Sequence, residues 1–302
     1  MTRMPPAEVD VTAALVMRLL ADQHPDFAEL PLLEVANGWD NVIFRLGDEL
    51  AVRLPRRQAA AELIRNEQRW LPEVSRGLAT VMPLPVRTGT PSSYFPWYWT
   101  ITRWLKGTVA ADIEAAHRSK AAADLARFVN AFHRPAPADA PRNTVRGVPL
   151  STRNAVVEER IAAADQPEEL LHLWRVLRDQ PEWTGPPLWL HGDLHAANLV
   201  LNPQCRLAGV LDFGDLTAGD PATDLAVAWL VFDRIGRRTF IETVTRERSV
   251  DSATWQRARG WALCIAAAMA ATDDNPAFHT MGIRILEDVL ADDILTDERP
   301  CR

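Results

Sequence analysis

The stretch from Leu190 to Trp229 constrains this chain more than any other part of its sequence. It presents Asp193, Asn198 and Asp212, each beside a short apolar run that is typical of a buried strand. Two carboxylates and an amide at strand ends suit a magnesium–phosphate site, because hard oxygen ligands hold Mg²⁺ and another carboxylate can orient a hydroxyl. We therefore predict that Asp193 is a catalytic base and that Asn198 and Asp212 are the metal ligands.

Neighbouring polar residues have simpler interpretations. His191 and His195 could suggest zinc, but they lie in a loop with no third soft ligand nearby, which disfavours that site. We expect His191 to pack as scaffold and His195 to lie near the phosphates. Asp215 is expected to be a solvated turn residue rather than a support for the site. The remaining acidic residues, Asp220 and Asp224, are expected to cap a helix and to hold the loop above it.

Composition excludes several classes of protein. The chain has 302 residues, 47% apolar and 24% charged, which fits one large domain or two lobes. No apolar run approaches the roughly 20 residues of a membrane span, and the N-terminus carries no signal-peptide pattern. A net charge of −7 disfavours nucleic acid and permits a cationic substrate. Because the three cysteines are odd in number and widely spaced, we expect a cytoplasmic protein without disulfides.

The order of elements indicates an α+β fold. Residues 32–54 alternate strands and turns and predict an antiparallel meander, followed by a helix over 59–71 and an aromatic-rich strand over 94–104. The aromatic cluster lacks interleaved basic residues, so core packing is the better interpretation than nucleic-acid stacking. Helices dominate from residue 110 onward. A small strand-rich half followed by a large helical half predicts a cleft between them.

A cation ends the third strand of the meander. Arg53 could contact nucleotide phosphates and pair with a carboxylate on the next helix, where Glu67 is the best-placed partner and Glu62 the alternative. The turn at 36–41 would lie over the phosphates if its flanking strands form a hairpin. Lys106 and the glycine after it mark the crossover between the two halves.

These motifs resemble the aminoglycoside phosphotransferase family, which has a two-lobed, protein-kinase-like fold. The matching segments are HGDLHAAN at 191–198, LDFGD at 211–215, GDP at 219–221 and DLA at 224–226. The resemblance implies a nucleotide-binding lobe at 1–105 and a catalytic, substrate-binding lobe at 106–302. It gives Asp193 the role of catalytic base and Asn198 and Asp212 the role of magnesium ligands.

The resemblance also implies a nucleotide site. Arg53 occupies the position of the phosphate-binding lysine, Glu67 that of its ion-pair partner, and the backbone of Arg103 and Leu105 would bind the purine. Arginine in place of lysine is a departure from the family pattern, because its planar guanidinium is bidentate and the two are not interchangeable.

The expected activity is transfer of the γ-phosphoryl group of ATP or GTP, with Mg²⁺, to a hydroxyl of a small molecule. An aminoglycoside antibiotic is the first candidate acceptor; a macrolide, a small metabolic alcohol, or a nucleotide-binding pseudoenzyme are the alternatives. We expect a monomer or weak dimer that binds neither nucleic acid nor membranes. An acidic pocket for a polycation could draw on Asp233, Glu242, Asp273, Asp274, Glu287 and Asp288, and an apolar one for a macrolide on Trp229, Trp255 and Trp261, although each set could equally be solvated or core residues.

Overall fold

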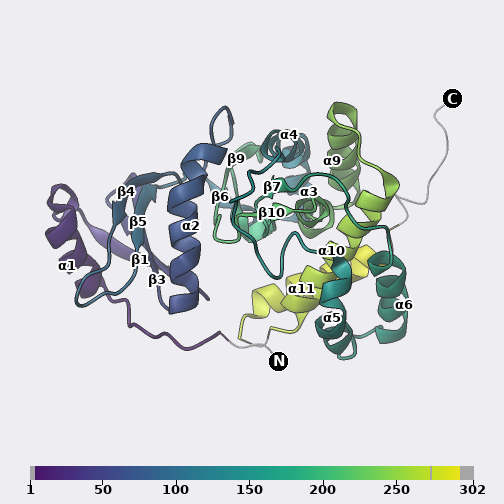
Figure 1. Cartoon of the computed structure of the whole chain (residues 1–302), viewed down its shortest axis with the longest axis horizontal. Helices are drawn as coiled ribbons and strands as arrows, with labels where there is room; N and C mark the ends of the chain where they lie inside the picture. The colour runs from purple at the N-terminus through teal and green to yellow at the C-terminus, as the bar shows by residue number, and fades with distance from the viewer. Residues whose placement is uncertain (1–3, 273, 293–302) are drawn as a thin grey trace.

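The computed structural model describes residues 4–272 and 274–292 and has a strand-rich N-terminal half and a mainly helical C-terminal half (Figure 1). The predicted α+β class is confirmed. Asp273 and residues 293–302, which include Cys301, lie outside the described residues.

A five-stranded antiparallel sheet in the order β1-β2-β3-β5-β4 forms the N-terminal half. The first three strands are the predicted meander. The predicted strand over 94–104 is too long, because Pro96 has no N–H to donate to a ladder and pairing begins only after it. The aromatic residues before β5 still pack into the core, where Phe95 and Trp97 are buried. The strands are β1 (Leu32–Asn37), β2 (Asn41–Leu46), β3 (Leu50–Pro55), β4 (Pro85–Gly89) and β5 (Trp99–Arg103).

Two helices flank this sheet. Helix α1 (Ala13–Gln23) begins where the side chain of Thr12 accepts a hydrogen bond from the Leu15 amide and caps the helix. Helix α2 (Gln58–Val74) lies between the sheet and the C-terminal half (Figure 1). Its position allows one helix to contribute to both halves.

Short strands carry the chemistry of the C-terminal half. Strand β7 (Leu188–Leu190) pairs with β10 (Thr217–Gly219), which the sequence did not predict, and β8 (Leu199–Leu201) pairs with both β6 (Thr108–Val109) and β9 (Leu207–Val210). The helical stretch after β10 is divided into two short helices. The helices are α3 (Ala115–Arg118), α4 (Ala122–Phe132), α5 (Asn154–Ile161), α6 (Pro167–Arg178), α7 (Ala222–Leu225), α8 (Val227–Val231), α9 (Arg234–Glu247), α10 (Ser252–Ala270) and α11 (Pro276–Leu290).

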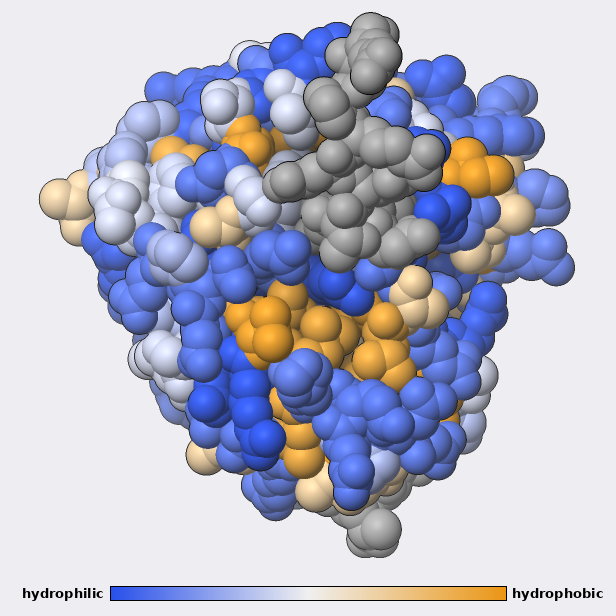
Figure 2. Space-filling view, turned by 90° about the vertical axis from the view of Figure 1, so that its right-hand side faces the viewer, coloured by the Kyte–Doolittle hydropathy of each residue, from blue (hydrophilic) through white to orange (hydrophobic). Residues whose placement is uncertain are grey.

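Each half has its own apolar cluster. The first packs α1 against the sheet, and the second contains the helices of the C-terminal half and the end of α2, where Trp70, Leu71 and Val74 are buried. The end of the molecule formed by the C-terminal helices is mostly hydrophilic, with an apolar patch near its centre (Figure 2). No helix among the described residues is long and apolar enough to span a membrane.

Candidate active site

The loop that follows β7 is the centre of the candidate site, and buried groups fix its backbone. Asp224 of α7 accepts hydrogen bonds from the backbone N–H groups of His191 and Gly192, each at 2.8 Å. Gly192 has φ +87°, and a side chain there would begin 2.4 Å from the carbonyl oxygen of Asp215. The expectation that Asp224 holds this loop is therefore confirmed, and only glycine fits immediately before Asp193.

The ring of His191 holds this loop in place. His191 is fully buried and packs on the ring of Phe213, with centroids 4.6 Å apart. Its Nε2 donates to the Leu211 carbonyl at 2.8 Å, and its Nδ1 accepts from the Asp193 amide at 3.2 Å. The ring of His191 thus ties the loop before Asp193 to the segment before Asp212.

The carboxylate of Asp193 is surrounded by donors. Nε2 of His195 lies 3.2 Å from Oδ2, and Nη2 of Arg146 donates to Oδ1 at 3.1 Å. The side-chain amide of Asn198 donates to the Asp193 carbonyl at 2.9 Å. One quarter of the Asp193 side chain remains exposed, so a reacting hydroxyl can reach it. Burial raises the pKa of this carboxyl, but His195 and Arg146 outweigh it and the pKa of Asp193 lies well below its usual range.

Arg146 is a site residue that the sequence analysis missed. It lies in the proline-rich connection between α4 and α5, which has no periodic pattern and was treated only as an irregular linker. Backbone contacts fix this connection on β10, since the Pro141 carbonyl accepts from the Ala218 amide and the Gly147 carbonyl accepts from the Asp220 amide. The only sequence signal was an arginine followed by glycine.

Asn198 and Asp212 lie beside one another, because the Leu211 amide donates to the Asn198 carbonyl at 2.8 Å. Asp212 has φ +56° and leaves half of its side chain exposed, while Asn198 is 8% exposed. An amide oxygen and one carboxylate are ligands that Mg²⁺ accepts when phosphate oxygens and water complete its shell. No cluster of three or more His, Cys, Asp or Glu side chains suited to a metal occurs within the described ranges.

Arg53 joins the two halves through two ion pairs. Its Nη1 donates to Glu67 Oε2 and its Nη2 to Asp212 Oδ1, both at 2.6 Å. With its amide oxygen turned toward the guanidinium, Asn41 also accepts from Arg53, at 3.0 and 3.2 Å. Burial lowers the pKa of Arg53, but the carboxylates of Asp212 and Glu67 raise it above its usual range. Glu67 is therefore the ion-pair partner, whereas Glu62 is exposed on the same helix.

The crossover between the halves contains the other two predicted nucleotide residues. Arg103 ends β5 opposite Leu50. Leu105 packs on Gly209, since a side chain on Gly209 would begin 2.4 Å from Cδ2 of Leu105. Lys106 pairs with Glu49 at 2.5 Å. The structure places these residues at and just after the end of β5; their contact with a purine and the lobe boundary at 105 stay predictions.

Asp215 is not the solvated turn residue that we expected. The side-chain amide of Asn143 donates to its Oδ1 at 2.6 Å, and its backbone carbonyl packs against Gly192. Burial and the nearby carboxylate of Asp193 raise the pKa of Asp215. The expectation was wrong because it considered only the local turn, while the connection that carries Asn143 comes from far away in the sequence.

The residues suggested for an acceptor pocket have other roles. Asp233 caps α9 and accepts from Ser119 at 2.6 Å, and Asp274 accepts from the Met4 amide. Glu242, Glu287 and Asp288 are exposed on helices. The three tryptophans considered for an apolar pocket, Trp229, Trp255 and Trp261, are buried in the second apolar cluster. Asp220 accepts from the Ala222 amide at the start of α7, as expected, and also pairs with Arg257 at 2.7 Å.

The fold and the site together define a phosphotransferase with a kinase-like fold. The chain belongs to the phosphotransferase enzyme family, whose model matches residues 31–261. The resemblance found in the sequence and the predicted two-lobed fold class are thereby confirmed. A comparison with curated proteins gives no match.

Solved structures support the same fold. The GDP complex of wild-type aminoglycoside 2'-phosphotransferase-IIIa is 18% identical, with a TM-score of 0.70 over 93% of this chain and 99% of that chain. Macrolide 2'-phosphotransferase type I is 19% identical, with a TM-score of 0.61 over 91% and 98%. The macrolide 2'-phosphotransferase MphH from Brachybacterium faecium is 18% identical, with a TM-score of 0.61 over 95% and 99%. At these identities the likeness shows the fold alone.

Proposed function

We propose that the protein transfers the γ-phosphoryl group of ATP or GTP to a hydroxyl of a small molecule, with Asp193 as the catalytic base. The observation that carries this proposal is the partly exposed Asp193 carboxylate, which His195 and Arg146 hold from opposite oxygens. A carboxylate with a lowered pKa is a weak base, so its main contribution is to orient the acceptor hydroxyl for in-line attack.

The nucleotide is proposed to lie between the sheet and the catalytic loop. Arg53 would contact its phosphates, with Glu67 holding the guanidinium in place. Asn198 and Asp212 would hold Mg²⁺, which when bound neutralises charge on the phosphates. The amide nitrogen of Asn198 already donates to the Asp193 carbonyl, so the amide oxygen would be the atom that binds the metal. The backbone of Arg103 and Leu105 would bind the purine.

Aminoglycosides are the first candidate acceptors. Similar solved structures include a phosphotransferase complex with GDP and kanamycin and a ternary complex with streptomycin and ATP. A resistance role would follow from that activity, and we expect it in the cytoplasm, where ATP and GTP are available.

A neutral or anionic acceptor is the second candidate, and Arg146 favours it. A polycation that approached Asp193 would meet a guanidinium 3.1 Å from the carboxylate. Two further arginines, Arg153 and Arg160, lie near the buried thiol of Cys264, as Arg146 does. All three lower the pKa of this thiol, although burial raises it by more. A macrolide or a small hydroxy acid suits this surrounding better than a compound with many ammonium groups.

A coupled assay of nucleoside-diphosphate release tests these proposals. The acceptor panel contains kanamycin, gentamicin, streptomycin, erythromycin, choline, homoserine and the anionic hydroxy acid glycerate, each with ATP and with GTP and Mg²⁺. We expect acceptor-dependent release with at least one compound, and wild type and Arg146→Gln to rank cationic and anionic acceptors differently. Nucleotide binding in a thermal shift, without transfer to any acceptor or to water, would support the pseudoenzyme alternative instead.

A further inference from the structure

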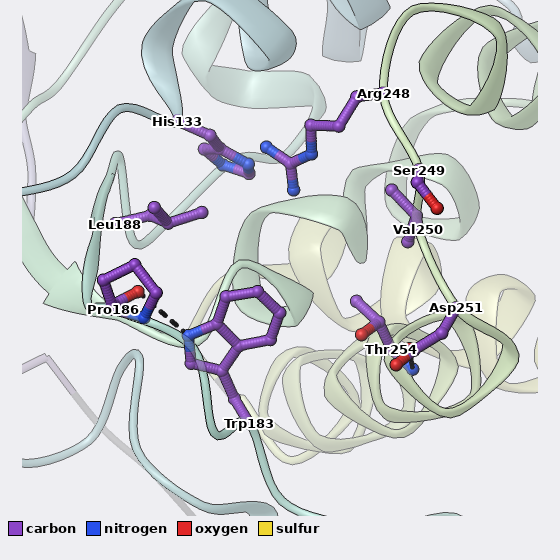
Figure 3. Close-up of a pocket in the computed structure, with 9 residues that line it drawn as sticks. All are labelled: His133, Trp183, Pro186, Leu188, Arg248, Ser249, Val250, Asp251 and Thr254. Carbon is purple, nitrogen blue, oxygen red and sulfur yellow. Dashed lines mark hydrogen bonds between the residues drawn. The ribbon is translucent and has the colours of Figure 1, made fainter.

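A cavity of about 390 Å³ is lined in part by Leu188, the first residue of the strand that leads into the catalytic loop (Figure 3). Its walls come from the end of α4, the segment before β7 and the turn between α9 and α10. This size falls within the range of pockets that hold small organic molecules. None of the residues predicted from the sequence as site residues lines it.

The cavity contains a cation without a partner. Arg248 follows α9, and its guanidinium extends toward His133 across the upper part of the cavity (Figure 3). Among the described residues no carboxylate pairs with it, and its Nη1 is buried without a hydrogen-bond partner. The one carboxylate in the wall, Asp251, is already engaged, because it caps α10 by accepting from the Thr254 amide at 2.7 Å. A desolvated, unpaired guanidinium indicates a missing anion.

His133 supplies a second unsatisfied group. Its side chain is fully buried, and Nε2 lies 3.1 Å from Oδ2 of Asp224. Because a carboxylate only accepts, Nε2 carries the proton of the neutral ring, and Nδ1 is an acceptor that has no partner within the described part of the chain. Burial lowers the pKa of His133 more than Asp224 raises it, which keeps the ring neutral. A ligand hydroxyl or N–H would satisfy Nδ1.

The rest of the wall mixes apolar side chains with two small polar ones, Ser249 and Thr254. The indole of Trp183 forms part of it, held by its Nε1–H donating to the Pro186 carbonyl at 3.0 Å. Leu188 and Val250 lie on opposite sides of the cavity (Figure 3). A flat apolar body could stack on the indole while its charged group reaches Arg248.

The cavity is connected to the catalytic loop by a single side chain. The Oδ2 atom of Asp224 that meets His133 also accepts from the His191 amide, and Oδ1 accepts from the Gly192 amide. Leu188, in the cavity wall, begins the strand that leads into the same loop. A group that contacts His133 therefore acts, through Asp224, on the backbone immediately before Asp193.

We propose that this cavity is a regulatory site for a small organic anion, a carboxylate or phosphate monoester on an apolar ring, whose binding rigidifies the catalytic loop. Arg248 binds the charge, His133 accepts from a donor on the ligand or its bound water, and Trp183 covers the ring. The proposal does not depend on the acceptor or on the phosphotransfer reaction.

Binding is tested by isothermal titration of the full chain with benzoate, phenyl phosphate, inorganic phosphate and the neutral control benzyl alcohol. The cleft is first saturated with a non-hydrolysable ATP analogue and Mg²⁺, so that phosphates cannot bind there. We expect saturable binding of at least one ring-bearing anion and none of benzyl alcohol. Arg248→Gln should weaken binding by about 10- to 100-fold, the range of a lost charged hydrogen bond. Arg246→Gln, at an exposed position at the end of α9, is the matched control and should bind like wild type.

Trp183→Ala distinguishes the parts of the ligand. It should weaken the binding of benzoate and of phenyl phosphate and leave the affinity for inorganic phosphate unchanged. The comparison of benzoate with phenyl phosphate identifies the preferred charged group. Absence of saturable binding of every anion, or equal affinities in wild type and Arg248→Gln, would overturn the binding site.

Coupling is measured by amide hydrogen exchange of the peptide that contains His191 and Gly192. At a probe concentration that just saturates wild type, exchange of these amides should slow severalfold in wild type and in Arg246→Gln. At the same concentration the exchange rate in Arg248→Gln should stay unchanged. If the probe binds but exchange in this peptide does not change, the regulatory link through Asp224 is wrong.

Discussion

Arg53 and Arg248 are two partly buried guanidiniums with opposite surroundings. Arg53, in the cleft, has Glu67, Asp212 and Asn41 as acceptors, so its position is fixed before any nucleotide arrives. Arg248, in the wall of the cavity, has no carboxylate partner among the described residues. The comparison teaches that paired charges already hold Arg53 in place, whereas Arg248 would gain a partner only from a ligand.

The largest effect is expected on the cleft side, at Asp193. Replacing Asp193 by Asn should lower kcat/KM on a confirmed acceptor by about 10²- to 10⁴-fold, the usual contribution of a general base. Nucleotide affinity, measured by titration, should change little because Asp193 does not contact Arg53. Full turnover of the variant would show that Asp193 is not the base. Asp48→Asn, at an exposed position, is the control and should turn over like wild type.

Asp224 lies between the two regions, and its loss should damage both. Asp224→Ala leaves His133 Nε2 and the His191 and Gly192 amides without their acceptor. We expect the free energy of unfolding in urea to fall by about 3–5 kcal/mol, because three buried donors lose their acceptor at about 1–3 kcal/mol each. Thr12→Ala, which removes only a helix cap, should cost about 1 kcal/mol. Similar losses in the two variants would show that the link between the regions is weak.

Arg53 tests whether preorganised pairing serves nucleotide binding. Arg53→Ala should weaken the affinity for ATP or GTP with Mg²⁺ by about tenfold or more, and Arg53→Lys by less, since an ammonium keeps the charge but loses the bidentate geometry. Titration with each nucleotide measures both. If Arg53→Ala binds nucleotide as wild type does, the guanidinium links the two halves structurally and does not contact phosphate.

The smallest effect concerns the pH dependence of stability at His133. Burial keeps the pKa of this ring below its usual value in the folded state, so the unfolded chain binds the proton more readily. The resulting stability is present above about pH 6.5, the unfolded value, and is lost as pH falls toward the folded one. Urea unfolding of wild type and His133→Asn between pH 5.5 and 7.5 should give a shallower slope for the variant. Parallel slopes would contradict the assignment.

The sequence was sufficient where function depends on closely spaced residues. Asp193 and Asn198 are five positions apart on one loop, and their spacing with Asp212 predicted a single site, which the hydrogen bond between Leu211 and Asn198 supports. The choice of Glu67 over Glu62 was also correct, because one turn of α2 decides which carboxylate faces the sheet.

The sequence was insufficient where distant segments meet. Arg146 and Asn143 lie in a connection without periodicity, and only its docking on β10 brings them to Asp193 and Asp215. Strand β10 is itself too short to leave an alternating pattern. Nor does any local signal show that Arg53 contacts Asp212, which belongs to the opposite side of the cleft.

The contact between Gly147 and Gly219 has a consequence for how the enzyme is made. A side chain on Gly219 would begin 2.1 Å from the Gly147 carbonyl oxygen, so the connection that carries Arg146 seats directly on the backbone of β10. β10 pairs with β7, and both are synthesised after that connection. During translation Arg146 can dock on β10 only after β10 has left the ribosome, whereas every strand of the N-terminal sheet is synthesised before Arg146.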